Sequence, residues 1–60
     1  MRLFKHKKTG NIYVYLCVGI DATNDRNGLP VVIYHPQDKE NTVYVREEKE
    51  FFEKFEPVTE

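Results

Sequence analysis

Apolar residues occupy every second position from residue 12 to residue 22, and this alternation is the most regular pattern in the chain. The apolar positions are Ile12, Val14, Leu16, Val18, Ile20 and Ala22. Successive side chains of a β-strand point to opposite faces, so the pattern predicts one long strand with a buried apolar face. Gly19 lies on the other face and indicates a bend or a β-bulge, because glycine weakens a straight strand.

Turn-forming residues divide the rest of the chain into short segments. A turn is expected at residues 8–11, where Gly10 tolerates a positive φ. The Asn27–Gly28 pair is a strong hairpin signal, and the polar residues 37–41 predict a second hairpin loop. These turns divide the chain into short segments, most of which we expect to be strands.

Two further strands follow from this division, over residues 31–35 and 42–46. In the second of them, Val43 and Val45 alternate with polar and aromatic residues. We therefore expect these two valines to face the core, and the residues between and after them to face away from it.

The C-terminal segment allows two interpretations. Residues 47–55 are rich in helix formers, and Phe51 and Phe55 would share one face of a helix. Alternatively, a single helical turn at residues 48–51 precedes a last strand at residues 52–58, since a helix of nine residues is weak by itself.

The resulting order of elements predicts an all-β fold. Five short strands with one helical turn before the last are the outline of a small SH3-like barrel, in which curling of the sheet removes exposed strand edges. The alternative is an antiparallel sheet covered by a short C-terminal helix. Sixty residues allow one small domain, spanning residues 1–60.

The charge distribution, the cysteine content and the lack of targeting segments indicate where the protein is expected to occur. The net charge is −1, but residues 2–8 are basic and residues 47–60 are acidic, so the two ends can attract each other or form separate faces. The single cysteine, Cys17, permits no internal disulfide. The chain shows no signal peptide and no apolar stretch of membrane-spanning length, so we expect a soluble cytoplasmic protein.

Four short blocks of the sequence carry a resemblance to a known family. They are Phe4, His6, Lys8, Gly10, Asn11 and Tyr13; then Val31, Val32, Ile33 and Tyr34; then Tyr44, Val45 and Arg46; and finally Phe51, Phe52 and Phe55. This pattern resembles the domain of unknown function 1653 family of small bacterial and phage proteins. It departs from the family pattern at Thr9, which is an extra turn residue, at Tyr44 in place of tryptophan, and at Glu47 in place of proline. The resemblance implies a small β-domain of bacterial or phage origin and no particular activity.

Aromatic and basic side chains form the candidate binding site. The expected members are Tyr13, Tyr15, Tyr34, Tyr44, Arg46, His6 and Lys8. The four tyrosines alternate away from the apolar face of their strands, and tyrosine and arginine are enriched at binding hot spots. We therefore expect a non-catalytic binding module that engages a protein partner, or a second copy of itself, through this face.

Two other interpretations of the same residues remain open. Tyrosines can stack on the bases of single-stranded nucleic acid while the lysines near the N-terminus contact phosphates. The tyrosines can also be structural and simply cover the second face of a small barrel.

Enzymatic chemistry, metals and cofactors are not expected. The chain contains no serine nucleophile and no glycine-rich phosphate loop, and the spacing of His6, Cys17, Asp21 and His35 matches no zinc arrangement. We also expect no small-molecule substrate, because sixty residues leave little room for a deep pocket.

Overall fold

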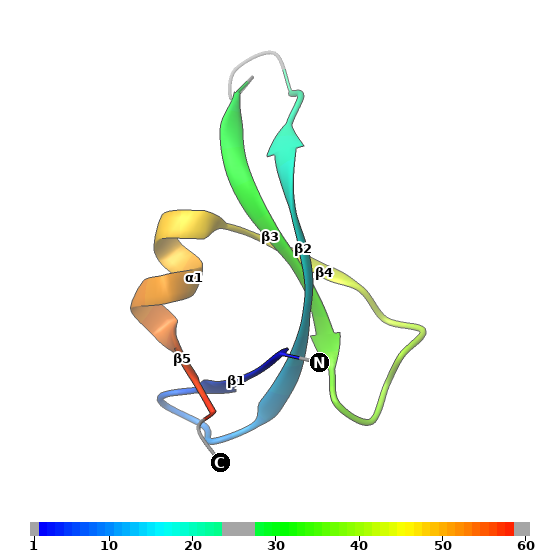
Figure 1. Ribbon diagram of the computed structural model, residues 1–60, viewed down its shortest axis with the longest axis vertical. Helices are drawn as coiled ribbons and strands as arrows, with labels where there is room; N and C mark the ends of the chain where they lie inside the picture. Colours follow the sequence, from blue (N-terminus) through cyan, green and yellow to red (C-terminus); the bar gives the residue numbers. More distant parts are fainter. Residues whose placement is uncertain (1, 24–27, 59–60) are drawn as a thin grey trace.

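Five antiparallel strands and one short helix make up the computed structural model, which describes residues 2–23 and 28–58. The elements are β1 (Arg2–His6), β2 (Ile12–Asp21), β3 (Leu29–Pro36), β4 (Tyr44–Glu47), α1 (Glu48–Lys54) and β5 (Phe55–Pro57). The strands lie in the order β4-β3-β2-β1-β5. The sheet curls into a half-barrel, and α1 connects its two edge strands (Figure 1). This confirms the predicted SH3-like arrangement, and the strand after the helix distinguishes it from the alternative fold.

A β-bulge divides β2 into two halves with opposite orientations. Tyr15 lies opposite Tyr34, but Cys17 lies opposite Ile33, so Leu16 is an extra residue in the pairing of β2 with β3. The bulge therefore lies at Leu16 and not at Gly19. Because the extra residue shifts the alternation, the continuous apolar pattern of the sequence does not lie on one face of the sheet.

The predicted single buried face of this strand is consequently wrong, because the apolar residues beyond the bulge lie on the other face of the sheet from Val14 and are exposed. Val14 is buried, whereas Leu16, Val18 and Ile20 keep 47%, 45% and 63% of their surface exposed. Ala22 is exposed as well. The tyrosines of the first half, by contrast, point toward the aromatic core.

The core is mainly aromatic and lies on the inner face of the sheet, the face toward α1. It consists of Phe4, Val32, Tyr34, Phe51 and Phe55, with Tyr13 and Tyr15 packed against it. The rings of Phe51 and Phe55 are stacked, with centroids 4.4 Å apart. Tyrosine rings are therefore part of the core, and the prediction that they lie opposite the buried face is wrong.

The β4 strand presents its aromatic and basic residues to this inner face. Tyr44 pairs with Tyr34, and Arg46 pairs with Val32. Val43 and Val45 are exposed, so the prediction that they face the core is also wrong. The alternation itself was predicted, but the face that it buries was not.

The C-terminal segment combines the two predicted alternatives. It forms a helix of seven residues, α1, and then a strand that begins at Phe55, three residues later than expected. The helix has acidic residues in its first turn and Lys54 in its last, which suits the helix dipole. Within the described residues, no helix has the length and apolar character needed to cross a membrane.

The basic start and the acidic end of the chain lie side by side, because β1 pairs with β5. Lys5 lies opposite Glu56, and their charged atoms are 3.8 Å apart. The two ends therefore lie next to each other, with one exposed ion pair between them. An exposed pair of this kind contributes about 1 kcal/mol or less to stability.

Two of the predicted turns are found, and the third lies partly outside the described residues. Gly10 has a φ of +79°, and the backbone N–H of Thr42 donates to the Lys39 carbonyl in the loop after β3. Asn27 lies outside the described residues. Gly28 has a φ of +96° and its N–H donates to the Asp21 carbonyl.

Replacing Gly10 by alanine should destabilise the domain by about 1–2 kcal/mol, because a Cβ atom disfavours a positive φ. A Cβ at this position meets no atom within 4 Å, so the cost comes from the backbone alone. Urea denaturation measures this difference. Gly10→Asn is the matched control and should cost less, since asparagine tolerates this conformation. Equal losses for both variants would contradict this explanation.

Candidate binding groove

The register of the strands brings the four predicted tyrosines onto one face of the sheet. Tyr34 lies at the centre, with ring centroids 5.5 Å from Tyr13 and 5.7 Å from Tyr44. It also packs against Phe51 and Phe55, and only 4% of its surface is exposed. Tyr34 is therefore mainly a core residue that connects the site to the hydrophobic core.

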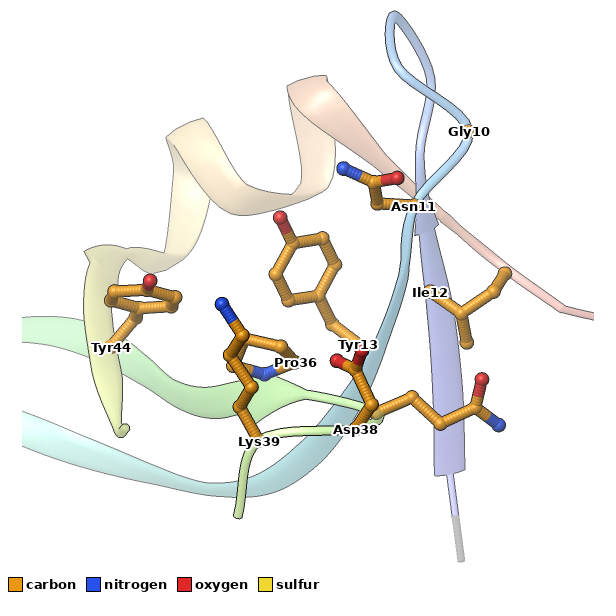
Figure 2. A pocket seen from close by; sticks show the side chains of 9 residues that line it. Gly10, Asn11, Ile12, Tyr13, Pro36, Asp38, Lys39 and Tyr44 are labelled. Carbon is orange, nitrogen blue, oxygen red and sulfur yellow. The ribbon is translucent and has the colours of Figure 1, made fainter. Parts of the chain in front are cut away.

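Tyr13 and Tyr44 remain accessible and line an open groove at one end of the inner face. The groove runs between the turn after β1 and the loop after β3, and Pro36 and Lys39 form its other side. Figure 2 shows the Lys39 side chain reaching up between the two tyrosine rings. We call this site the Tyr13–Tyr44 groove.

The groove continues toward β4 and reaches Arg46. The Arg46 Nε atom donates to the Tyr34 hydroxyl at 3.2 Å, and its terminal nitrogen contacts a Glu50 carboxylate oxygen at 2.6 Å. The guanidinium also lies over the Phe55 ring, 5.7 Å from its centroid. The hydrogen bond to Tyr34 is the main reason that the pKa of Arg46 is raised above its usual value, and Glu50 adds to the effect. The positive charge is thus held in one place and orientation.

His6 and Lys8 have different places in the structure. The His6 Nδ1 atom accepts hydrogen bonds from the backbone N–H groups of Lys8 and Thr9, at 3.2 and 3.3 Å. The imidazole also packs edge-on against Phe55 and lines the Arg46 end of the groove. His6 therefore fixes the turn beside the groove, while Lys8 is exposed on that turn and does not line the groove.

Tyr15 lies away from the groove. Its ring packs against Phe4 and Phe51, and the Arg2 guanidinium stacks over it at 4.6 Å from the centroid. Six of the seven predicted residues, all except Lys8, thus lie around one core. Of these six, Tyr15 lies outside the groove.

The segment from the end of β3, at Pro36, to Lys39 lines the groove but was not among the predicted site residues. Pro36 and Lys39 come from the segment that was interpreted only as the end of a strand and a loop. Loop residues carry no periodic signal, so only the fold shows that this loop returns beside Tyr13.

A comparison with protein-family models gives one match, to the family described as "Protein of unknown function (DUF1653)", over residues 2–59. The match covers nearly the whole chain.

The chain belongs to the DUF1653 family.

Comparison of this DUF1653 chain with curated proteins and with solved structures gives no match. The family match agrees with the resemblance of the four sequence blocks, and the family description gives no activity.

The three departures from the family pattern have clear places in this DUF1653 structure. The extra residue Thr9 accepts a hydrogen bond from the Asn11 N–H in the turn beside the groove. Tyr44 forms one wall of the groove. Glu47 ends β4 immediately before α1. Two of the three departures thus lie at the groove or its rim.

The possible metal ligands of this DUF1653 chain are dispersed. Over residues 2–23 and 28–58, no three histidine, cysteine or acidic side chains lie close enough to hold a metal ion together. The His35 ring is buried and its Nδ1 atom lies 2.6 Å from the Pro36 carbonyl oxygen. Both imidazoles therefore have structural contacts that account for their positions.

Proposed function

We propose that this DUF1653 domain is a non-catalytic binding module, and that the Tyr13–Tyr44 groove takes a segment of a protein partner. The observation that carries this proposal is the combination of two accessible tyrosine walls with Lys39 between them. Aromatic residues and arginine are enriched in the buried centres of protein interfaces, where they supply large contact areas.

The groove is held in shape by the core before any partner arrives. Tyr44 packs against Tyr34, which is itself fixed between Phe51 and Phe55. Arg46 is held by its contacts with Tyr34 and Glu50. A site that is already ordered loses less conformational entropy on binding, which favours affinity.

Charge favours a protein segment over a nucleic acid as the ligand. The chain has a net charge of −1, Arg46 is paired with Glu50, and Lys5 is paired with Glu56. Asp38 also lines the groove. Nucleic-acid binding depends on unpaired lysine and arginine side chains that displace counterions from phosphates.

Capture of partners from a lysate by immobilised domain tests the proposal when it is done with matched variants. Tyr44→Ala should weaken binding of the specific partner at least about tenfold, as expected for loss of a tyrosine hot spot. Val45→Ala is the control, because Val45 is the next residue, is exposed and faces away from the groove.

The outcomes of this capture experiment separate the candidate ligands. A partner that survives nuclease and high salt and is lost only with Tyr44→Ala supports the proposal. A ligand that is destroyed by nuclease or released at moderate salt identifies a nucleic acid and contradicts it. Equal capture by the two variants would exclude the groove as the binding site.

A further inference from the structure

The Tyr13–Tyr44 groove ends in a small pocket that is lined by His6, Tyr34 and Arg46, and we call it the Arg46 pocket. Tyr13 and Tyr44 line both the groove and the pocket, so the pocket is open to a segment that lies in the groove. Its volume is about 270 Å³. Sites for small-molecule ligands are usually larger, roughly 300–1,000 Å³, so the Arg46 pocket suits a single side chain.

The hydroxyl group of Tyr34 provides a hydrogen-bond donor at this pocket. Tyr34 lines the pocket although only 4% of its surface is exposed. Its oxygen accepts the hydrogen bond from Arg46 Nε, so its own hydrogen remains to be donated. Over residues 2–23 and 28–58, no acceptor takes this hydrogen. A ligand acceptor in the pocket would therefore satisfy a buried donor, which is costly to leave unpaired.

His6 adds a second donor of fixed orientation. Its Nδ1 atom accepts hydrogen bonds from the backbone N–H groups of Lys8 and Thr9. A neutral imidazole that accepts at Nδ1 carries its hydrogen on Nε2, which is then a donor. His6 lines the pocket, and within the described part of the chain nothing accepts the Nε2 hydrogen. The turn after β1 thus fixes the ring as a donor beside the pocket.

Arg46 supplies a positive charge that no acidic residue faces inside the pocket. Its bonds to Tyr34 and Glu50 use only part of its N–H groups, so others remain to be donated. Glu50 does not line the pocket, and none of the described residues that line it carries a carboxylate. Asp38 lines the other part of the groove, and the Tyr13 hydroxyl points away from it (Figure 2). The pocket is therefore rich in donors and has no anion of its own.

We propose that the Arg46 pocket binds the carboxylate of an aspartate or glutamate side chain of the partner segment, an inference that rests on the proposed function of the groove. A carboxylate only accepts hydrogen bonds, and it can accept from Tyr34, His6 and Arg46 together. The amide of an asparagine or glutamine would direct its own N–H groups at these same donors. An acidic side chain is thus the best match to the pocket.

The charge of the pocket favours a carboxylate over a phosphate. Arg46 is the one lysine or arginine among the described residues that line it, and Glu50 already shares its charge. A phosphate group carries a larger negative charge and is usually bound by clusters of arginine. A single carboxylate needs less positive charge, because most of its binding here comes from hydrogen-bond donors.

An NMR titration of isotope-labelled domain with N-acetylglutamate amide and N-acetylglutamine amide tests this inference. The glutamate probe should bind with a Kd of about millimolar order, as expected for so small a ligand, and about fivefold or more tightly than the glutamine probe. The Arg46 Nε–H signal and the His6 ring signals should move most. The probes contain no partner sequence, so this titration can fail while capture by the groove succeeds, and the reverse.

Two substitutions that remove the same charge provide the matched comparison. Arg46→Gln should weaken binding of the glutamate probe about tenfold or more, because it removes a charged donor of the pocket. Lys8→Gln should leave the Kd within about twofold, because Lys8 is exposed and does not line the pocket. Tyr34→Phe keeps the aromatic ring and removes only the hydroxyl. It should weaken binding about threefold or more, and it tests the inference even if Arg46→Gln folds poorly.

The outcomes separate the Arg46 pocket from general attraction of anions. A preference for the glutamate probe that Tyr34→Phe reduces and Lys8→Gln keeps supports the inference. Equal binding of the two amides, or equal weakening by Arg46→Gln and Lys8→Gln, would overturn it. Tighter binding of inorganic phosphate would assign the pocket to a phosphorylated ligand. Tighter binding of N-acetylglycine would assign it to a chain terminus, and either result would also overturn the inference.

Discussion

Phe51→Ala should destabilise the domain by about 3–5 kcal/mol, the range observed for large-to-small changes at buried aromatic residues. Phe51 is fully buried and its ring contacts Phe4, Tyr34 and Phe55. A domain of 60 residues has a total stability of about 3–9 kcal/mol. The substitution therefore removes a large part of the stability and should leave much of the protein unfolded. Circular dichroism with thermal and urea denaturation measures the loss.

The neighbouring residue provides the matched control for this prediction. Phe52 has the same side chain on the same helix, but 46% of its surface is exposed. Phe52→Ala should cost less than half as much as Phe51→Ala, although Phe52 does contact Phe4 and Phe51. If the two variants lost equal stability, α1 would not bury the face that the structure assigns to it.

Val14→Asp and Val18→Asp should differ strongly in stability, although both positions belong to the same apolar alternation in the sequence. Val14 is buried opposite His35, whereas Val18 is 45% exposed beyond the bulge. An unpaired carboxylate at a buried position costs at least about 2–3 kcal/mol, while a partly exposed strand position tolerates aspartate for about 1 kcal/mol. Urea denaturation measures both values.

The position of the bulge decides the outcome of this comparison. Because Leu16 is an extra residue, Val18 lies on the opposite face of the sheet from Val14. Similar destabilisation by the two aspartates would show that the strand is regular and would contradict the observed register. Tyr15→Ala should also be destabilising, because the Tyr15 ring packs against Phe4 and Phe51.

The order of the elements could be predicted because turn chemistry marks their boundaries. Gly10 and the Asn27–Gly28 pair separate segments whose alternation indicates strands, and the phenylalanines near the C-terminus indicate a helical turn. The grouping of Tyr44 with Arg46 on one face also followed from alternation within a strand. These features depend on local sequence, which is available without a structure.

The buried face could not be predicted because the tyrosines of β2 face the aromatic core, and an extra residue in the strand pairing then reverses the alternation. Leu16 looks like one more apolar position, and nothing in its neighbours shows that β3 passes over it. A tyrosine side chain also combines an apolar ring with a polar hydroxyl, so its type alone does not show whether it is buried. In this small domain the rings of Tyr13 and Tyr34 complete an aromatic core, and the Tyr34 hydroxyl holds Arg46 in the groove.

There is a further reason why the groove could not be predicted from the sequence. Its walls come from the start of β2 and, far along the sequence from it, from the loop after β3 and the start of β4. Lys39 enters the site because that loop folds back beside Tyr13, as Figure 2 shows. A sequence pattern identifies residue types that suit binding, but the juxtaposition of these segments is a property of the tertiary structure.

The most direct test of the proposed function is an NMR titration of isotope-labelled domain with the partner segment identified by capture. We predict that the largest chemical-shift changes occur at Tyr13, Lys39 and Tyr44, with smaller changes at Arg46. Changes that concentrate elsewhere, such as on the outer face around Val45, or that are unaltered in Tyr44→Ala, would contradict the assignment of the Tyr13–Tyr44 groove as the binding site.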